Sequence, residues 1–107
     1  MKFLKHLAVV TLSFLFCFSA FADKLKVGFV YVGPVGDHGW TYMHEQGRLA
    51  VKKAFGDKVE TTFIESVKYG PEAETVIRAM ANSGTDLIFA TSFGYMEPML
   101  KVAKEFP

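Results

Sequence analysis

Residues 26–32 have the sequence KVGFVYV, a short apolar run that is preceded by charge and followed by glycine. Val27, Phe29 and Tyr31 would lie on one face of an extended strand, and valines would occupy the other. Strands that are apolar on both faces are typical of parallel sheets with helices packed on either side. This run therefore predicts a central parallel strand.

Two more strand and helix units follow it. Residues 58–65 mix polar with apolar side chains, which favours an edge strand. Residues 86–91 (DLIFAT) are apolar on both faces of an extended strand, which favours a central one. Amphipathic segments over 40–55, from Pro71 and from near Phe93 predict the connecting helices. We expect an α/β fold, a parallel sheet of spatial order 2-1-3 with right-handed crossovers and flanking helices.

The predicted helix over 40–55 carries one stripe of apolar and small residues, and we expect that stripe to face the sheet. Its members are Trp40, Met43, Gly47, Ala50, Val51 and Ala54. A glycine on the stripe would permit close approach to the sheet. In the helix from Pro71 we expect Ala73, Val76, Ile77 and Met80 to face inward.

The amino terminus has the pattern of an export signal. Lys2 and Lys5 precede an apolar stretch over residues 7–18, and SAFA at residues 19–22 matches the A-x-A pattern of a signal peptidase site. A membrane anchor is the alternative, but a spanning helix needs about 20 apolar residues, and this core is shorter. We interpret residues 1–22 as a cleavable secretory signal and expect a periplasmic protein.

Composition excludes several classes of function for the exported part. Cys17 follows Phe16, where lipid attachment would need a small residue, so we do not expect a lipoprotein. A chain beginning at Asp23 would contain no cysteine, which excludes a disulfide scaffold and thiol chemistry. Without Lys2 and Lys5 the formal charge falls from +1 to −1. Nucleic-acid binding is not expected, because it rests on clustered Lys and Arg.

The candidate binding site lies at the carboxyl ends of the strands, beside the point where strand order reverses. The loop over residues 33–40 (GPVGDHGW) and the loop over residues 91–95 (TSFGY) would meet there. Each combines glycines with an aromatic ring and polar groups, as ligand sites do. The candidate ligand-binding residues are Asp37, Trp40, Phe93, Gly36, His38, Ser92 and Gly94.

Each of these side chains has a structural alternative. Trp40 would either stack on a planar ligand or begin the buried stripe, and Phe93 would either complete an aromatic clamp or plug the core. Asp37 would bind ligand donors or cap the first helix, and Ser92 would contact ligand or cap the third. We interpret His38 as a solvated loop residue rather than a catalyst.

Motifs for catalysis, metals and cofactors mostly fail. The glycines of the first loop are spaced G-x-x-G-x-x-G and not G-x-G-x-x-G, although Glu65 stands where a dinucleotide site places its ribose acid. The segment from His44 to Arg48 (HEQGR) begins like a zinc-protease helix but has Arg in place of the second His. We expect no catalytic residue, metal or cofactor. A secreted enzyme using Asp37, His38 or Glu65 as acid or base remains an alternative.

Two long stretches carry a family resemblance. Residues 23–48 (DKLKVGFVYVGPVGDHGWTYMHEQGR) and residues 76–107 (VIRAMANSGTDLIFATSFGYMEPMLKVAKEFP) follow the signal in that order. The pairing of G-D-x-G-W-T-Y with T-S-F-G-Y-M closely resembles the basic membrane protein family of periplasmic substrate-binding proteins that serve ABC transporters. The likeness covers residues 23–107 and is strongest to the purine-binding, PnrA-like branch.

This resemblance implies a type I periplasmic binding protein, whose two lobes close on a purine nucleoside or nucleobase and deliver it to an ABC permease. Carried over, Trp40 takes the place of the first-loop aromatic, Asp37 that of the first-loop acid, and Phe93 belongs to the loop after the third strand. Many relatives carry Phe-Asn where this chain has Trp40-Thr41, which leaves open whether base or nucleoside is preferred. Residues 23–107 would form an incomplete first lobe, truncated after the third unit. A sensor lobe of the same fold, not coupled to transport, is the alternative.

Overall fold

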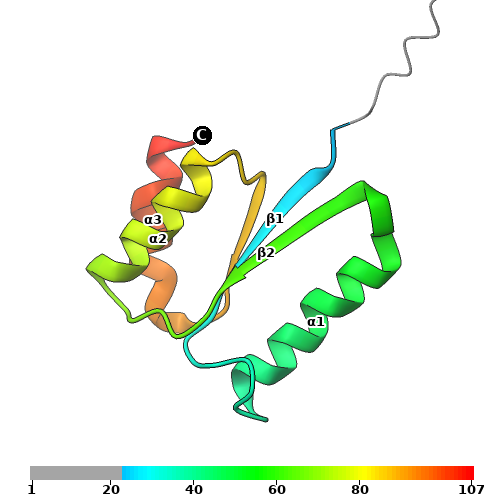
Figure 1. Ribbon diagram of the computed structural model, residues 1–107. Helices are drawn as coiled ribbons and strands as arrows, with labels where there is room; N and C mark the ends of the chain where they lie inside the picture. Colours follow the sequence, from blue (N-terminus) through cyan, green and yellow to red (C-terminus); the bar gives the residue numbers. More distant parts are fainter. Residues whose placement is uncertain (1–22) are drawn as a thin grey trace, which may run out of the picture.

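The structure is a computed structural model that describes residues 23–107, and the expected signal over residues 1–22 lies outside the described residues. Strands and helices alternate along the chain (Figure 1). In order they are β1 (Leu25–Val30), α1 (Trp40–Phe55), β2 (Val59–Ile64), α2 (Pro71–Asn82), β3 (Leu87–Ala90) and α3 (Met96–Glu105). Short 3-10 turns, η1 (Gly56–Lys58) and η2 (Phe93–Tyr95), precede β2 and α3. None of these helices has the length and apolar character that crossing a membrane requires.

The three strands form one parallel sheet in the order β2-β1-β3, which confirms the predicted order. Val27 of β1 lies between Thr61 of β2 and Leu87 of β3 in the register. Helix α1 covers one face of the sheet, and α2 and α3 cover the other (Figure 1). All three strands therefore present their carboxyl ends, and the loops that follow them, at one edge of the sheet.

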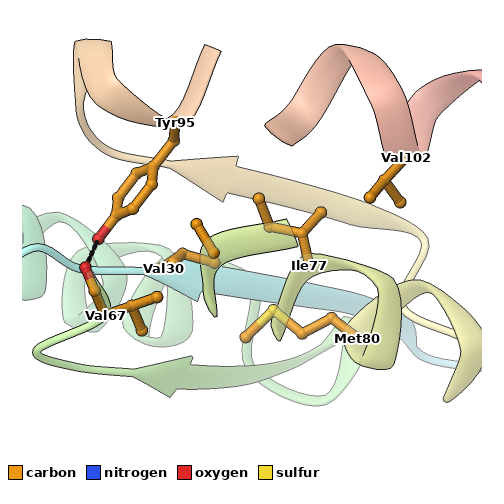
Figure 2. Packing of buried hydrophobic residues seen from close by; sticks show 7 residues of the cluster. Val30, Val67, Ile77, Met80, Tyr95 and Val102 are labelled. Carbon is orange, nitrogen blue, oxygen red and sulfur yellow. Dashed lines mark hydrogen bonds between the residues drawn. The ribbon is translucent and has the colours of Figure 1, made fainter. Parts of the chain in front are cut away.

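The core beneath α2 and α3 is apolar and follows the predicted pattern. Ile77 and Met80 of α2 pack with Val30 of β1, as Figure 2 shows, and Ala73 is buried with them. Helix α2 comes so close to β1 that a Cβ on Gly28 would lie 2.9 Å from the Met80 Sδ. The expected inward face of this helix is confirmed.

The apolar stripe of α1 is not packed on the sheet as expected. Its buried residues are Thr41, Glu45 and Arg48, whereas Met43 is 64% exposed and nothing lies within 4 Å of a Cβ built on Gly47. Three members of the stripe, Met43, Gly47 and Val51, instead line an open groove between α1 and β3, together with Phe29 and Phe89 of the sheet. Within residues 23–107, β3 pairs only with β1, so nothing in the described chain covers this groove.

A buried polar network holds α1 on the sheet in place of that stripe. The Tyr31 hydroxyl donates to Glu45 Oε2 at 2.9 Å, and Arg48 Nε donates to the same oxygen at 2.8 Å. Arg48 Nη1 donates to the Thr61 hydroxyl at 2.8 Å, and its guanidinium carbon lies 4.7 Å from the centre of the Phe63 ring. The hydrogen bonds from Arg48 hold the pKa of Glu45 below its usual value, against the opposing effect of burial. An ion pair thus orients the helix that begins at the candidate site.

Candidate functional site

All seven candidate residues lie at or just beyond the carboxyl edge of the sheet, in the loops after β1 and β3 or at the start of α1. The structure joins the two loops directly, because the indole Nε1 of Trp40 donates to the carbonyl oxygen of Thr91 at 2.8 Å. The loop after β2 runs beside both of them. The edge therefore carries three connected loops, where the sequence had indicated two.

Trp40 is held in place and is still 60% exposed. Its hydrogen bond to Thr91 fixes one edge of the indole, and His44 packs edge-on against it with ring centres 4.8 Å apart. The Nε2 atom of His44 is buried and has no hydrogen-bond partner among residues 23–107. The alternative that placed Trp40 on a buried stripe is wrong. An exposed flat ring of fixed orientation is suited to stacking on a planar ligand.

Phe93 is 86% exposed at the start of η2, so the alternative that placed it in the core is wrong. Tyr95, two residues later, occupies the position in the hydrophobic core instead. It is fully buried, and its hydroxyl donates to the carbonyl oxygen of Val67 at 2.6 Å (Figure 2). Burial raises the pKa of Tyr95 to about 12, so the phenol keeps its proton and remains a donor.

Asp37 satisfies N–H groups of the first turn of α1, as its capping interpretation expected, although Gly39 and not Asp37 occupies the N-cap position. Its carboxylate accepts hydrogen bonds from the backbone N–H groups of Gly39 at 2.8 Å, Tyr42 at 2.9 Å and Thr41 at 3.3 Å. These donors, Gly39 first, hold the pKa of Asp37 below its usual value. The carboxylate is therefore ionised near neutral pH and acts only as an acceptor. Its side chain remains exposed, so a ligand contact is compatible with the cap.

The remaining four candidates differ in how closely neighbouring side chains pack against them. Gly36 is open, with nothing within 4 Å of a Cβ, and exposed His38 adopts a left-handed backbone with φ of +53°. A Cβ on Gly94 would lie 2.5 Å from ring carbons of Tyr69, so that glycine is required by a neighbouring side chain. The Ser92 hydroxyl bonds with the Tyr69 hydroxyl at 2.6 Å and makes no helix-capping bond, contrary to its capping alternative.

Of the residues that follow β2, the sequence pattern pointed only to Glu65, and the contribution of this loop to the edge was missed. The Glu65 carboxylate accepts from the backbone N–H of Val35 at 2.7 Å, which gives this acid a role in the first loop in place of a ribose contact. Tyr69 is 54% exposed beside Ser92 and Gly94. The rule that parallel strands end at one edge applied equally to β2 and would have found this loop. Among residues 23–107 no group of three or more His, Cys, Asp or Glu side chains could hold a metal ion.

Comparisons with known proteins agree with this architecture. Residues 24–107 match the family described as ABC transporter substrate-binding protein PnrA-like. A purine-binding protein of Brucella abortus (strain 2308) is 60% identical over 85 residues, which are 79% of this chain and 24% of that protein. A putative ABC transporter glucose-binding protein of Haloferax volcanii is 36% identical over 85 residues, 79% of this chain and 21% of that protein.

A solved structure shares the fold. The ABC transporter solute-binding protein from Conexibacter woesei superposes with a TM-score of 0.71 at 28% sequence identity, and the match covers 78% of this chain and 27% of that one. The chain thus spans about a quarter of the length of the relatives that it matches.

Proposed function

Because this chain belongs to the PnrA-like family of ABC transporter substrate-binding proteins, we propose that it captures a purine nucleobase or nucleoside for an ABC importer. The observation that carries this proposal is the exposed indole of Trp40, fixed by its bond to Thr91 at the edge where parallel strands end. Ligands of open α/β sheets bind at that edge. The name of the Brucella relative, at 60% identity, favours a purine over other planar ligands.

Stacking is the main interaction that we assign to Trp40. An aromatic ring stacked on a base contributes about 1–3 kcal/mol, and the ring here is already oriented before ligand arrives. Phe93, more exposed still and two residues beyond Thr91, is the second aromatic of the proposed site. Gly36 and Gly94 flank these rings with little side-chain bulk, and His38 and Ser92 add polar groups at the same edge.

Asp37 supplies hydrogen-bond acceptors. A carboxylate kept ionised by three backbone donors accepts hydrogen bonds from the N–H groups of a base or from ribose hydroxyls. Because its acceptor atoms are already oriented at the start of α1, binding costs little further ordering. We assign Asp37, Trp40 and Phe93 the principal ligand contacts on this lobe.

The proposed mechanism is capture and release without covalent chemistry. Ligand contacts from this lobe and from a second lobe would stabilise a closed form, which docks on a membrane permease while a separate ATPase supplies the energy. Residues 1–22 would direct export to the periplasm and be removed. The acids that an enzyme would need, Asp37 and Glu65, already accept backbone hydrogen bonds, which favours binding over catalysis.

Titration calorimetry on the full-length protein tests the proposal. Adenine, adenosine and guanosine are compared with a sugar panel that includes glucose, and Trp fluorescence is followed in parallel. We expect saturable purine binding with a change in Trp emission, and no release of free base from the nucleosides. Tight sugar binding with no response to any purine would contradict the assignment.

A further inference from the structure

We propose that the segment after β2, residues 65–69, is a positioning element that fixes the loops after β1 and β3 relative to each other and thereby sets the geometry of the binding site. The binding part of this inference rests on the function proposed above. None of these five residues needs to touch ligand, because they act through the loops that do.

The first half of the segment holds the loop after β1. Glu65 accepts from Val35 N at 2.7 Å, Ser66 N donates to Gly33 O at 3.2 Å, and Val67 N donates to Tyr31 O at 3.0 Å. Ser66 makes its contact with a left-handed backbone, φ +56°, which costs a non-glycine residue on the order of 1 kcal/mol or more. Strain of this kind persists only where the surrounding contacts enforce it.

The second half holds the loop after β3. The Val67 carbonyl accepts the Tyr95 hydroxyl at 2.6 Å, and the Tyr69 hydroxyl bonds with Ser92 Oγ at 2.6 Å. The Tyr69 ring packs so tightly on Gly94 that no side chain fits between them, and it meets the Tyr95 ring edge-on at 5.2 Å. Residues on either side of Phe93 are therefore both held by Tyr69.

These contacts predict that Tyr69 fixes the position of Phe93. They also predict that Glu65 fixes the conformation of the first residues of the loop that carries Asp37. Val67 connects the two halves, because its N–H bonds to the β1 side and its carbonyl to the β3 side. A site held in this way binds more tightly, because less freedom is lost when ligand arrives.

Two variants of the full-length protein test this, each with a matched control. Tyr69→Phe removes only the hydroxyl that bonds Ser92, and its control, Thr62→Val, removes an exposed hydroxyl of β2 that has no hydrogen-bond partner within residues 23–107. Glu65→Ala removes the acceptor of Val35, and its control is Glu60→Ala, an exposed acid within β2. Glu65→Gln keeps a neutral acceptor oxygen at the same place.

We expect each test variant to bind adenosine about three- to tenfold more weakly, because a loop released from its hydrogen bond must be ordered again when ligand arrives. The thermal midpoint should stay near that of the wild type. Glu65→Gln should recover most of the affinity, and the controls should bind as the wild type does. Hydrogen–deuterium exchange should quicken over residues 91–95 in Tyr69→Phe and over residues 33–37 in Glu65→Ala.

The two readouts separate this inference from the proposed function. If the wild type binds none of adenine, adenosine and guanosine, the proposed function fails. The hydrogen–deuterium exchange measurement then tests the positioning element by itself. Unchanged exchange in both test variants would overturn it in either case. Equal losses of adenosine affinity in the test and control variants would overturn it as well.

Discussion

Replacing Arg48 by methionine should destabilise the protein far more than its place on an amphipathic helix suggests. The side chains of Arg48 and Glu45 are only 10% and 11% exposed, and the substitution removes two charge-assisted bonds to Glu45 and one to Thr61. Removing one partner of a buried pair costs about 3–5 kcal/mol, because the other charge is left uncompensated. Since the Tyr31 hydroxyl still donates to Glu45, we expect about 3 kcal/mol, near the lower end.

Urea unfolding of the full-length protein, followed by far-UV circular dichroism, measures this loss. The matched control is Arg78→Met, because Arg78 also bonds two carboxylates, Glu74 at 2.8 Å and Glu105 at 2.7 Å, on a far more exposed surface. Exposed pairs contribute about 0–1 kcal/mol, so the control should unfold nearly as the wild type does. The double variant Glu45→Leu, Arg48→Met should regain part of the loss, since it leaves no charge unpaired, although the buried Tyr31 hydroxyl loses its acceptor. Equal effects of Arg48→Met and Arg78→Met would refute the assignment of a buried network.

Further expectations concern the site, the core and export. Trp40→Ala should weaken adenosine binding by about 1–3 kcal/mol in calorimetry if the indole stacks, and an unchanged affinity in a folded variant would remove it from the site. Gly94→Ala should cost about 1–3 kcal/mol in urea unfolding because its Cβ would meet the Tyr69 ring, and a wild-type midpoint would show that the ring moves freely. The folded-state pKa of Glu45 is depressed, so its contribution is complete above its unfolded pKa of about 4.3 and is lost as pH falls through the folded value. Unfolding measured down the acid range should show that loss, and Glu45 ¹³C shifts that titrate at or above the unfolded pKa would contradict it. Mass spectrometry of the exported protein should find Asp23 at its amino terminus, and an intact leader would contradict the signal.

The strand order and the bounds of α1 were predictable because they depend on local patterns, whereas α3 begins at Met96 and a 3-10 turn occupies the expected start near Phe93. Helix α1 spans Trp40–Phe55 as expected, and α2 begins at Pro71, whose fixed backbone and missing N–H suit a first helical position. The order 2-1-3 followed from which strands were apolar on both faces, and the sheet confirms it. Strand β1 ends at Val30, two residues before the apolar run does, although Tyr31 N still donates to the carbonyl oxygen of Ile64 at 2.9 Å.

The orientation of α1 was not predictable from its apolar stripe. Glu45 and Arg48 stand three positions apart, a spacing that on an isolated helix forms a modest surface pair. Only the sheet reveals their burial, because Tyr31 and Thr61 come from two different strands to complete the network. Hydrophobic periodicity shows which residues share a face, and it does not show which face a tertiary polar network selects.

The exposure of Phe93 and Trp40 at the candidate site could not be predicted from sequence either. For each, the sequence offered burial or ligand contact, and a large aromatic residue is more often buried. Tyr95 occupies the core, so Phe93 remains exposed at the edge of the sheet. The Thr91 carbonyl accepts a hydrogen bond from the indole of Trp40 and leaves the ring exposed. Both outcomes depend on hydrogen bonds to backbone carbonyls, at Val67 and at Thr91, which no side-chain pattern encodes. The aromatic residues could thus be placed at the right edge of the sheet from sequence, and the atoms that keep them exposed there required the fold.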